Sequence, residues 1–138
     1  MLITIKRDAH ITSPNDMYEL LKAVLYRKHR FDYEKEHFYV IIVSRNNRAK
    51  FIDEISIGNL NSTIVSPREV FRFAILKGAE AIIVAHNHPS GNLTPSDHDK
   101  TVTTTLIKAG EVLGIKVMDS LIITKTGYFS FLEKGLMG

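Results

Sequence analysis

The chain has 138 residues, a formal net charge of +3 at neutral pH, 44% hydrophobic residues and no cysteine. A chain of this length and hydrophobic content can bury the core of one globular domain without disulfide bonds. The absence of cysteine excludes thiolate nucleophiles, iron–sulfur clusters and cysteine-ligated zinc, so histidine and carboxylate side chains are the candidate metal ligands. The slight basic excess gives only weak support for a nucleic-acid partner.

No linker, internal repeat or low-complexity segment interrupts the sequence, which predicts a single domain over residues 1–138. The first residues lack the basic and apolar regions of a secretory signal, and no apolar run approaches the length of a membrane span. We therefore expect a cytoplasmic protein that has no membrane partner.

Three segments begin with the same helix signal, a Ser or Thr cap followed by Pro and then by an acidic residue at the third helical position. These signals predict helices over residues 14–29, 67–78 and 95–114, the last with Thr94 as its cap. In the first helix, the 3.6-residue spacing predicts a buried set made of Met17, Leu20, Leu21, Val24 and Leu25. In the third helix, the corresponding set is Val102, Leu106, Ala109, Val112 and Leu113.

Runs rich in β-branched and aromatic residues lie between these helices. They predict strands over residues 37–44, 49–57, 81–85, 116–124 and 128–132. Turn residues at 45–48 and 125–127 predict two hairpins, and the apolar 81–85 run is typical of a strand buried on both faces. We therefore expect an α/β domain in which helices pack on a mixed sheet.

Polar side chains gather directly after the 81–85 strand. His86 and His88 are two positions apart, so on an extended segment both imidazoles point to one side and can share a metal ion. Ser96 and Asp99 are three apart, which puts them on one face of the following helix. Two neutral imidazoles and one carboxylate would leave Zn²⁺ an open position for a water whose pKa falls toward about 7.

A metal hydrolase also needs a proton carrier that is not itself a ligand. Glu54, inside the predicted 49–57 strand, is our candidate, although an ion pair with Arg45 or Lys50 would equally explain a glutamate there. The competing acids are Asp53, which should face the opposite side of the strand, and Glu69 and Glu80, which suit positions that cap or flank elements. Ser96, at a helix N-terminus, is the candidate stabiliser of an oxyanion.

The remaining histidines have simpler interpretations. We expect His98 to be exposed rather than a ligand, because adjacent helical residues diverge by about 100°. His10, His29 and His37 are expected to lie at the surface or at a sheet edge. Ser90 lies in a Pro-Ser-Gly turn without the glycine pattern of a nucleophile elbow, so turn formation explains it.

The spacing of His86, His88, Ser96 and Asp99 is that of the JAMM (MPN+) metalloprotease signature, and residues 86–91 have the form that it takes in RadC-like JAB domains. The sequence resembles that family from about residue 10 to residue 136. The resemblance implies a three-layer α/β/α sandwich with a mixed sheet, the JAB/MPN fold, related to the cytidine deaminases. It also implies zinc held by His86, His88 and Asp99, Glu54 as general acid/base, and assistance from Ser96.

Two departures from the family pattern are visible. RadC proteins carry an N-terminal helix-hairpin-helix region, and because this sequence begins at the JAB domain, we do not transfer a DNA-binding role of that region. Most RadC-like sequences also have histidine where this chain has Ser120, which affects support of the site or a substrate contact rather than the predicted metal ligands.

The leading hypothesis is a zinc-dependent hydrolase that cleaves peptide or isopeptide amides, the substrate class that the resemblance implies. A DNA-repair-associated accessory module, which binds nucleic acid and uses its metal structurally, is the second hypothesis. Deamination of a nucleobase is a third, and the missing Cys-x-x-Cys and His-x-Glu pattern argues against it. The sequence leaves the oligomeric state open.

Overall fold

The computed structural model describes residues 1–27, 33–58 and 65–138. Within them, six strands form one sheet in the order β1-β3-β2-β4-β5-β6. The strands are β1 (Leu2–His10), β2 (Glu36–Ser44), β3 (Arg48–Gly58), β4 (Ala81–Asn87), β5 (Lys116–Ile123) and β6 (Tyr128–Ser130). The helices are α1 (Pro14–Leu25), α3 (Pro67–Leu76) and α4 (Asp97–Leu113), and a short 3₁₀ turn, η1 (Arg45–Asn47), joins β2 to β3.

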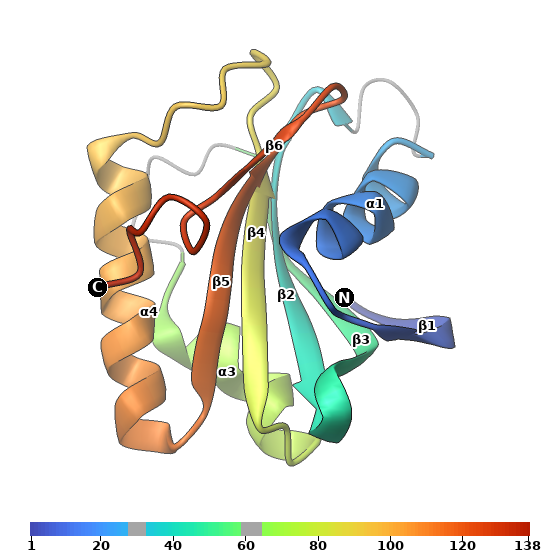
Figure 1. Ribbon diagram of the computed structural model, residues 1–138, viewed down its shortest axis with the longest axis vertical. Helices are drawn as coiled ribbons and strands as arrows, with labels where there is room; N and C mark the ends of the chain where they lie inside the picture. The colour runs from blue at the N-terminus through green and yellow to red at the C-terminus, as the bar shows by residue number, and fades with distance from the viewer. Residues whose placement is uncertain (28–32, 59–64) are drawn as a thin grey trace.

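The sheet is mixed, as the sequence predicts. β4 and β5 run parallel, whereas the other neighbouring strands pair antiparallel. A parallel pair needs a crossover connection, and α4 supplies it here. This connection brings the chain from the carboxyl end of β4 to the first turn of α4, both at the upper end of Figure 1.

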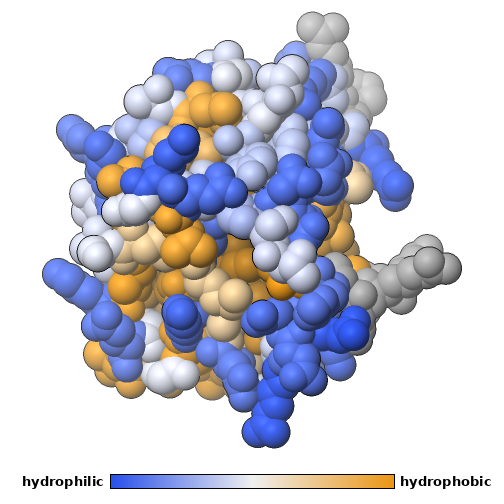
Figure 2. Space-filling model, viewed as in Figure 1, coloured by the Kyte–Doolittle hydropathy of each residue, from blue (hydrophilic) through white to orange (hydrophobic). Residues whose placement is uncertain are grey.

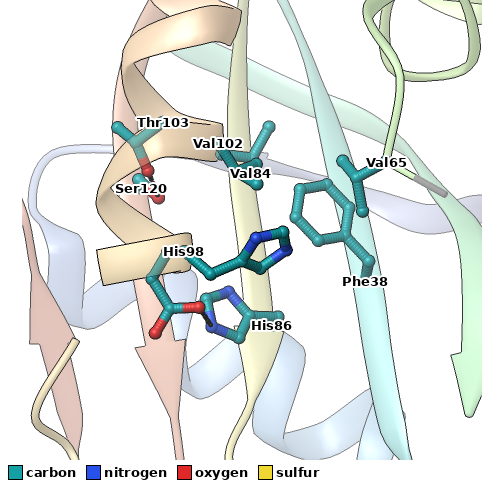
Figure 3. Close-up of a pocket in the computed structure, with 9 residues that line it drawn as sticks. Phe38, Val65, Val84, His86, His98, Val102, Thr103 and Ser120 are labelled. Atoms are coloured by element: carbon teal, nitrogen blue, oxygen red, sulfur yellow. Dashed lines mark hydrogen bonds and ion pairs between the residues drawn. The ribbon is translucent and has the colours of Figure 1, made fainter. Parts of the chain in front are cut away.

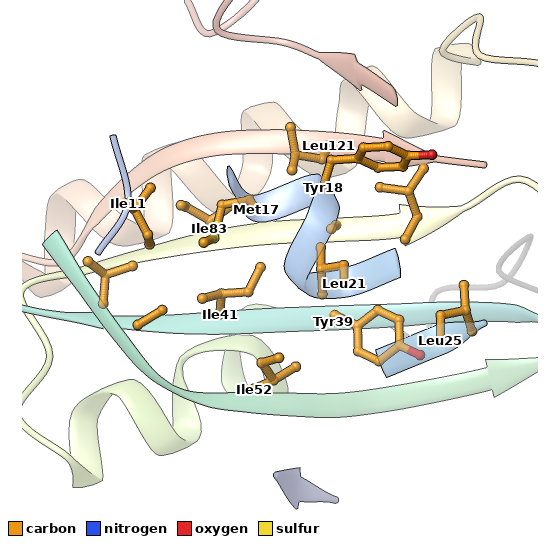
Figure 4. Packing of buried hydrophobic residues seen from close by; sticks show 14 of the residues in the cluster. Ile11, Met17, Tyr18, Leu21, Leu25, Tyr39, Ile41, Ile52, Ile83 and Leu121 are labelled. Carbon is orange, nitrogen blue, oxygen red and sulfur yellow. The ribbon is translucent and has the colours of Figure 1, made fainter. Parts of the chain in front are cut away.

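Helices cover both faces of the sheet, which confirms the three-layer α/β/α architecture (Figure 1). On one face, Met17, Leu21 and Leu25 of α1 pack against strand residues such as Tyr39 and Leu121, as Figure 4 shows. On the other face, α3 and α4 pack against a second cluster of strand side chains. The second cluster contains Phe38, Val40, Val70, Phe71, Ala74, Ile82, Val84, Leu106, Ile115 and Val117.

Helix α1 forms where its cap signal predicts, because Ser13 and Asp16 make a reciprocal capping box. The helix ends at Leu25 rather than near residue 29, and residues 28–32, including His29, lie outside the described part of the chain. Its predicted buried set is right for three members, whereas Leu20 and Val24 are only half-buried.

Other boundaries also differ from the predictions. Helix α4 begins at Asp97 with Ser96 as its cap, so Thr94 is not the cap. Near the other end of α4, Val112 and Leu113, which the sequence predicts to be buried, are 88% and 45% exposed, because the buried face of the helix carries Leu106 and Gly110 instead. The last strand, β6, is shorter than predicted, since a turn follows residue 130.

Local patterns predict no element over the first residues, yet these residues form the edge strand β1. It pairs with β3, from Leu2 opposite Asp53 to His10 opposite Arg48. An edge strand depends on a partner far away in the chain, which local patterns do not reveal.

Among the described residues, none of the helices combines the length and the apolar character that a membrane crossing requires. The face seen in Figure 2 has hydrophilic residues around much of its rim and hydrophobic residues toward its centre. Large apolar side chains are exposed at a few positions, among them Leu76, Val112 and Leu132.

Candidate metal centre

The end of β4 and the start of α4 bring the signature residues together. Side chains alternate along β4, so Ile82, Val84 and His86 face α3 and α4. His88 follows just beyond the strand, and Asp99 lies in the first turn of α4. The loop between them returns over the strand end, which is where open α/β sheets commonly hold their sites.

Three potential ligand atoms converge here. The Nε2 atoms of His86 and His88 are 3.2 Å apart, and they lie 3.1 Å and 3.3 Å from the two carboxylate oxygens of Asp99. All three ligand atoms lie within 4.8 Å of one another. His86 is buried, and His88 and Asp99 are partly buried, so the cluster is reachable from solvent on one side. Two imidazoles and one carboxylate in this arrangement suit a zinc site that keeps one position open.

The loop around His88 orients its ring for metal binding. Its Nδ1 lies 2.6 Å from the carbonyl oxygen of Asn92, an arrangement in which Nδ1–H donates to that oxygen. In neutral His88, the proton on Nδ1 leaves Nε2 with a free lone pair that points toward His86 and Asp99. Metal-binding histidines commonly donate their second N–H to a backbone carbonyl in this way.

Electrostatic contacts within the cluster favour a charged carboxylate. Burial raises the pKa of Asp99, but hydrogen bonds from His86 and His88 outweigh it and hold that pKa below its ordinary value. The hydrogen bond with Asp99 raises the pKa of His88, and burial lowers it by less. The negative charge of Glu36 also raises this pKa. The carboxylate of Asp99 is therefore ionised and available as a ligand at neutral pH.

Ser96 positions Asp99 as well as capping α4. The Ser96 hydroxyl accepts a hydrogen bond from the Asp99 N–H at 3.0 Å, and Asp99 Oδ2 accepts one from the Ser96 N–H at 2.8 Å. This capping box fixes the Asp99 carboxylate at the helix start, facing the two histidines. The hydroxyl hydrogen of Ser96 is not used by the cap.

His98, which precedes Asp99 in the chain, is exposed, as predicted.

Replacing Ser96 with alanine should lower the free energy of unfolding by about 1 kcal/mol, because the helix loses its cap. Thr94→Ala should change that free energy by less than about 0.5 kcal/mol, since the structure does not use Thr94 as a cap. Urea unfolding of the two variants measures both values. Equal losses in the two variants would contradict the assignment of the cap to Ser96.

A cleft lies beside the cluster, between β2, β4 and α4 (Figure 3). Apolar side chains form part of its wall, and Phe38 stacks on His86 with ring centroids 6.2 Å apart. Deeper in the cleft, the hydroxyls of Thr103 and Ser120 are 2.9 Å apart and share a hydrogen bond. Ser120, the position where most RadC-like sequences have histidine, therefore lines the same cleft as His86 and Asp99.

Glu54 lies on the opposite face of the sheet from the candidate ligands. It pairs in register with Tyr39, whose side chain packs in the cluster under α1. Its carboxylate contacts His37 Nδ1 rather than Arg45, which pairs with Glu80. His37 is fully buried, so its predicted surface position is wrong. His37 is buried because β2 lies between β3 and β4 inside the sheet, and its backbone N–H donates to Asn87 of β4.

The competing acids form ion pairs with arginines and do not contact the candidate ligands. Asp53 is buried on the face that α3 covers, with Oδ2 3.8 Å from the Arg72 guanidinium. Glu69 pairs with the same arginine at 3.2 Å. Glu80, the third competing acid, pairs with Arg45. None of the three belongs to the ligand cluster that the described residues form.

Glu36 is the carboxylate that the sequence analysis missed as a site residue. It begins β2, and two residues later Phe38 lies opposite His86 in the antiparallel ladder. By alternation, Glu36 and Phe38 point to the same face as His86, and Glu36 lies level with the strand end that leads to His88. The charge of Glu36 also contributes to the raised pKa of His88, in keeping with this shared face. The signal available in the sequence was the two-residue spacing of Glu36 and Phe38, which puts both side chains on one face of a strand.

The sequence matches the family described as the RadC-like JAB domain over residues 11–136. The chain belongs to the RadC-like JAB domain family. Its relatives include UPF0758 proteins of Caldanaerobacter subterraneus, 46% identical over 135 residues, and of Listeria welshimeri, 40% identical over 134 residues. These alignments cover 98% and 97% of this chain, and 56% and 58% of the two relatives. The JAB domain described here thus spans little more than half the length of the curated relatives that it matches.

Proposed function

We propose that this JAB domain is a zinc-dependent hydrolase of the JAMM class, which cleaves peptide or isopeptide amides with an activated water. One observation carries the proposal: two imidazole Nε2 atoms and an ionised carboxylate converge within 4.8 Å at one end of a cleft. The family membership supports it, because the JAB signature residues are the ones that converge.

His86, His88 and Asp99 would hold the zinc ion. When bound, zinc would lower the pKa of a coordinated water and polarise a substrate carbonyl. The carbonyl of Asn92 and the capping box of Ser96 hold the His88 ring and the Asp99 carboxylate in their orientations before any metal arrives. Preorganised ligands of this kind lose little conformational freedom on binding.

We assign proton transfer to Glu36 in preference to Glu54. Glu36 shares the face of His86 and lies at the strand end that leads to His88, whereas Glu54 contacts His37 on the opposite face of the sheet. The Glu36 carboxylate would accept a proton from the attacking water and deliver it to the leaving amine. The Ser96 hydroxyl hydrogen, which the helix cap leaves available, would donate to the developing oxyanion.

The cleft beside the cluster has a volume of only about 20 Å³, and Phe38, Val84 and Val102 form its apolar wall. It has room for a group the size of a water molecule and not for a substrate side chain. The peptide-like substrate class is therefore supported by the family membership and not by the shape of this cleft.

The direct test is a screen of zinc-loaded protein against peptides and isopeptide-linked conjugates, with cleavage followed by mass spectrometry. We expect cleavage that a chelator abolishes and added zinc restores. Nucleic-acid binding that weakens steeply with salt and ignores the chelator, with no cleavage of any amide, would instead favour the accessory-module hypothesis.

A further inference from the structure

Asn87 lies between the two candidate histidine ligands but points away from them. It ends β4 and is fully buried. Because side chains alternate along the strand, the Asn87 amide faces the α1 side, whereas His86 faces α4. It therefore does not contribute to the ligand cluster and needs another explanation.

All hydrogen bonds that the structure gives the Asn87 amide go to one short segment. Its Oδ1 accepts from the backbone N–H of His37 at 2.6 Å. Its Nδ2 donates to the carbonyl oxygens of Lys35 at 2.9 Å and Tyr33 at 3.3 Å. These three backbone groups lie on both sides of Glu36, so one buried side chain ties the Glu36 segment to the strand that carries His86.

A second buried contact secures the same segment from the neighbouring strand. His37 Nδ1 contacts the Glu54 carboxylate of β3, and the His37 ring stacks on Tyr39 with centroids 6.0 Å apart. The pair lies beside a β-bulge, where Phe38 is opposite Ser56 and Tyr39 is opposite Glu54. A bulge interrupts the backbone hydrogen bonds between β2 and β3 at this point. The His37–Glu54 contact joins the two strands there through side chains.

We infer that Asn87 is a positioning residue that holds Glu36 beside His88, with the His37–Glu54 pair as its support. The inference rests on the proposed function of Glu36. At this end of the sheet, the face toward α4 carries His86 and Glu36. The face toward α1 carries the Asn87 and His37 contacts that hold the Glu36 segment in place. An amide is required at residue 87, because the segment presents one N–H and two carbonyl groups to it.

Hydrogen exchange tests the contacts without any substrate. Asn87→Ala should speed exchange of the His37 amide by about tenfold or more, since a buried hydrogen bond is lost. Asn87→Asp keeps the acceptor for that amide and should leave its exchange close to the native rate. Asn46→Asp, an exposed control in η1 beyond the far end of β2, should leave exchange of the His37 amide unchanged. Unchanged exchange of the His37 amide in Asn87→Ala would overturn the inference.

A double-mutant cycle on the cleaved peptide tests the link to Glu36. Asn87→Ala and Asn87→Asp should each lower kcat by about tenfold or more, with KM and zinc content unchanged, as expected when a positioned group is displaced. In a Glu36→Gln background, Asn87→Ala should lower kcat no further. If the double variant loses kcat by the product of the two single losses, Asn87 does not act through Glu36 and the positioning role is overturned. Full activity of Glu36→Gln alone would instead overturn the function proposed for Glu36.

Discussion

Replacing His86 with alanine, or Asp99 with asparagine, should abolish zinc retention by the purified protein. Each change removes a ligand from the cluster, and because loss of a supporting contact alone weakens metal binding by 10- to 100-fold, loss of a ligand should weaken it by more than about 100-fold. Asparagine at residue 99 keeps an oxygen for the Ser96 N–H, so the helix cap survives the change. Metal content by mass spectrometry should fall from about one zinc per chain to a trace.

His98→Ala is the matched control for this experiment. His98 is next to Asp99 in the sequence but is exposed and does not belong to the ligand cluster. The His98→Ala protein should retain its zinc. If native protein binds no zinc even after zinc is added, or if the His86 and Asp99 variants retain it, the metal centre is assigned incorrectly.

Glu36→Gln should lower kcat for the cleaved amide by about 10²- to 10⁴-fold, the usual contribution of a general acid/base. Zinc content should stay unchanged, because Glu36 is not one of the three candidate ligands. Glutamine keeps the size and hydrogen-bonding capacity of the side chain but cannot take up the proton. Steady-state kinetics and metal content, measured on the same preparations, separate the two effects.

Glu54→Gln provides the comparison, because Glu54 is the proton carrier that the sequence predicts, whereas the structure places it away from the candidate ligands. With Glu54 against His37 on the opposite face, its replacement should lower kcat less than Glu36→Gln does, through loss of support for the Glu36 segment. If Glu54→Gln removes turnover while Glu36→Gln leaves it intact, Glu54 is the proton carrier and our assignment is wrong.

Local signals were sufficient for most of the secondary structure. Ser13 and Ser66 cap helices where the sequence predicts caps, because a capping hydroxyl bonds to a backbone N–H only three residues away. The apolar 81–85 run forms the first five residues of β4, which is buried on both faces. Thr94 was a wrong prediction because Ser96 makes a reciprocal box with Asp99, and the two caps compete within two residues.

The convergence of His86, His88 and Asp99 also follows from the sequence to a large extent. A strand, a short loop and a capped helix place these side chains on one side, and each spacing is local. The mixed sheet and the three layers were expected from the resemblance to RadC-like JAB domains, and the strand order β1-β3-β2-β4-β5-β6 realises them.

The sequence by itself thus determined the starts of α1 and α3, the buried strand β4 and the three candidate ligands, because short-range geometry specifies each of them. Tertiary structure alone decided which carboxylate lies beside the ligands. The faces of Glu36 and Glu54 depend on the pairing of β2 with β3 and β4, and a bulge shifts the register between residues 38 and 39. A shift of one residue reverses the face of a side chain, and pairing between distant strands, not local pattern, sets that register.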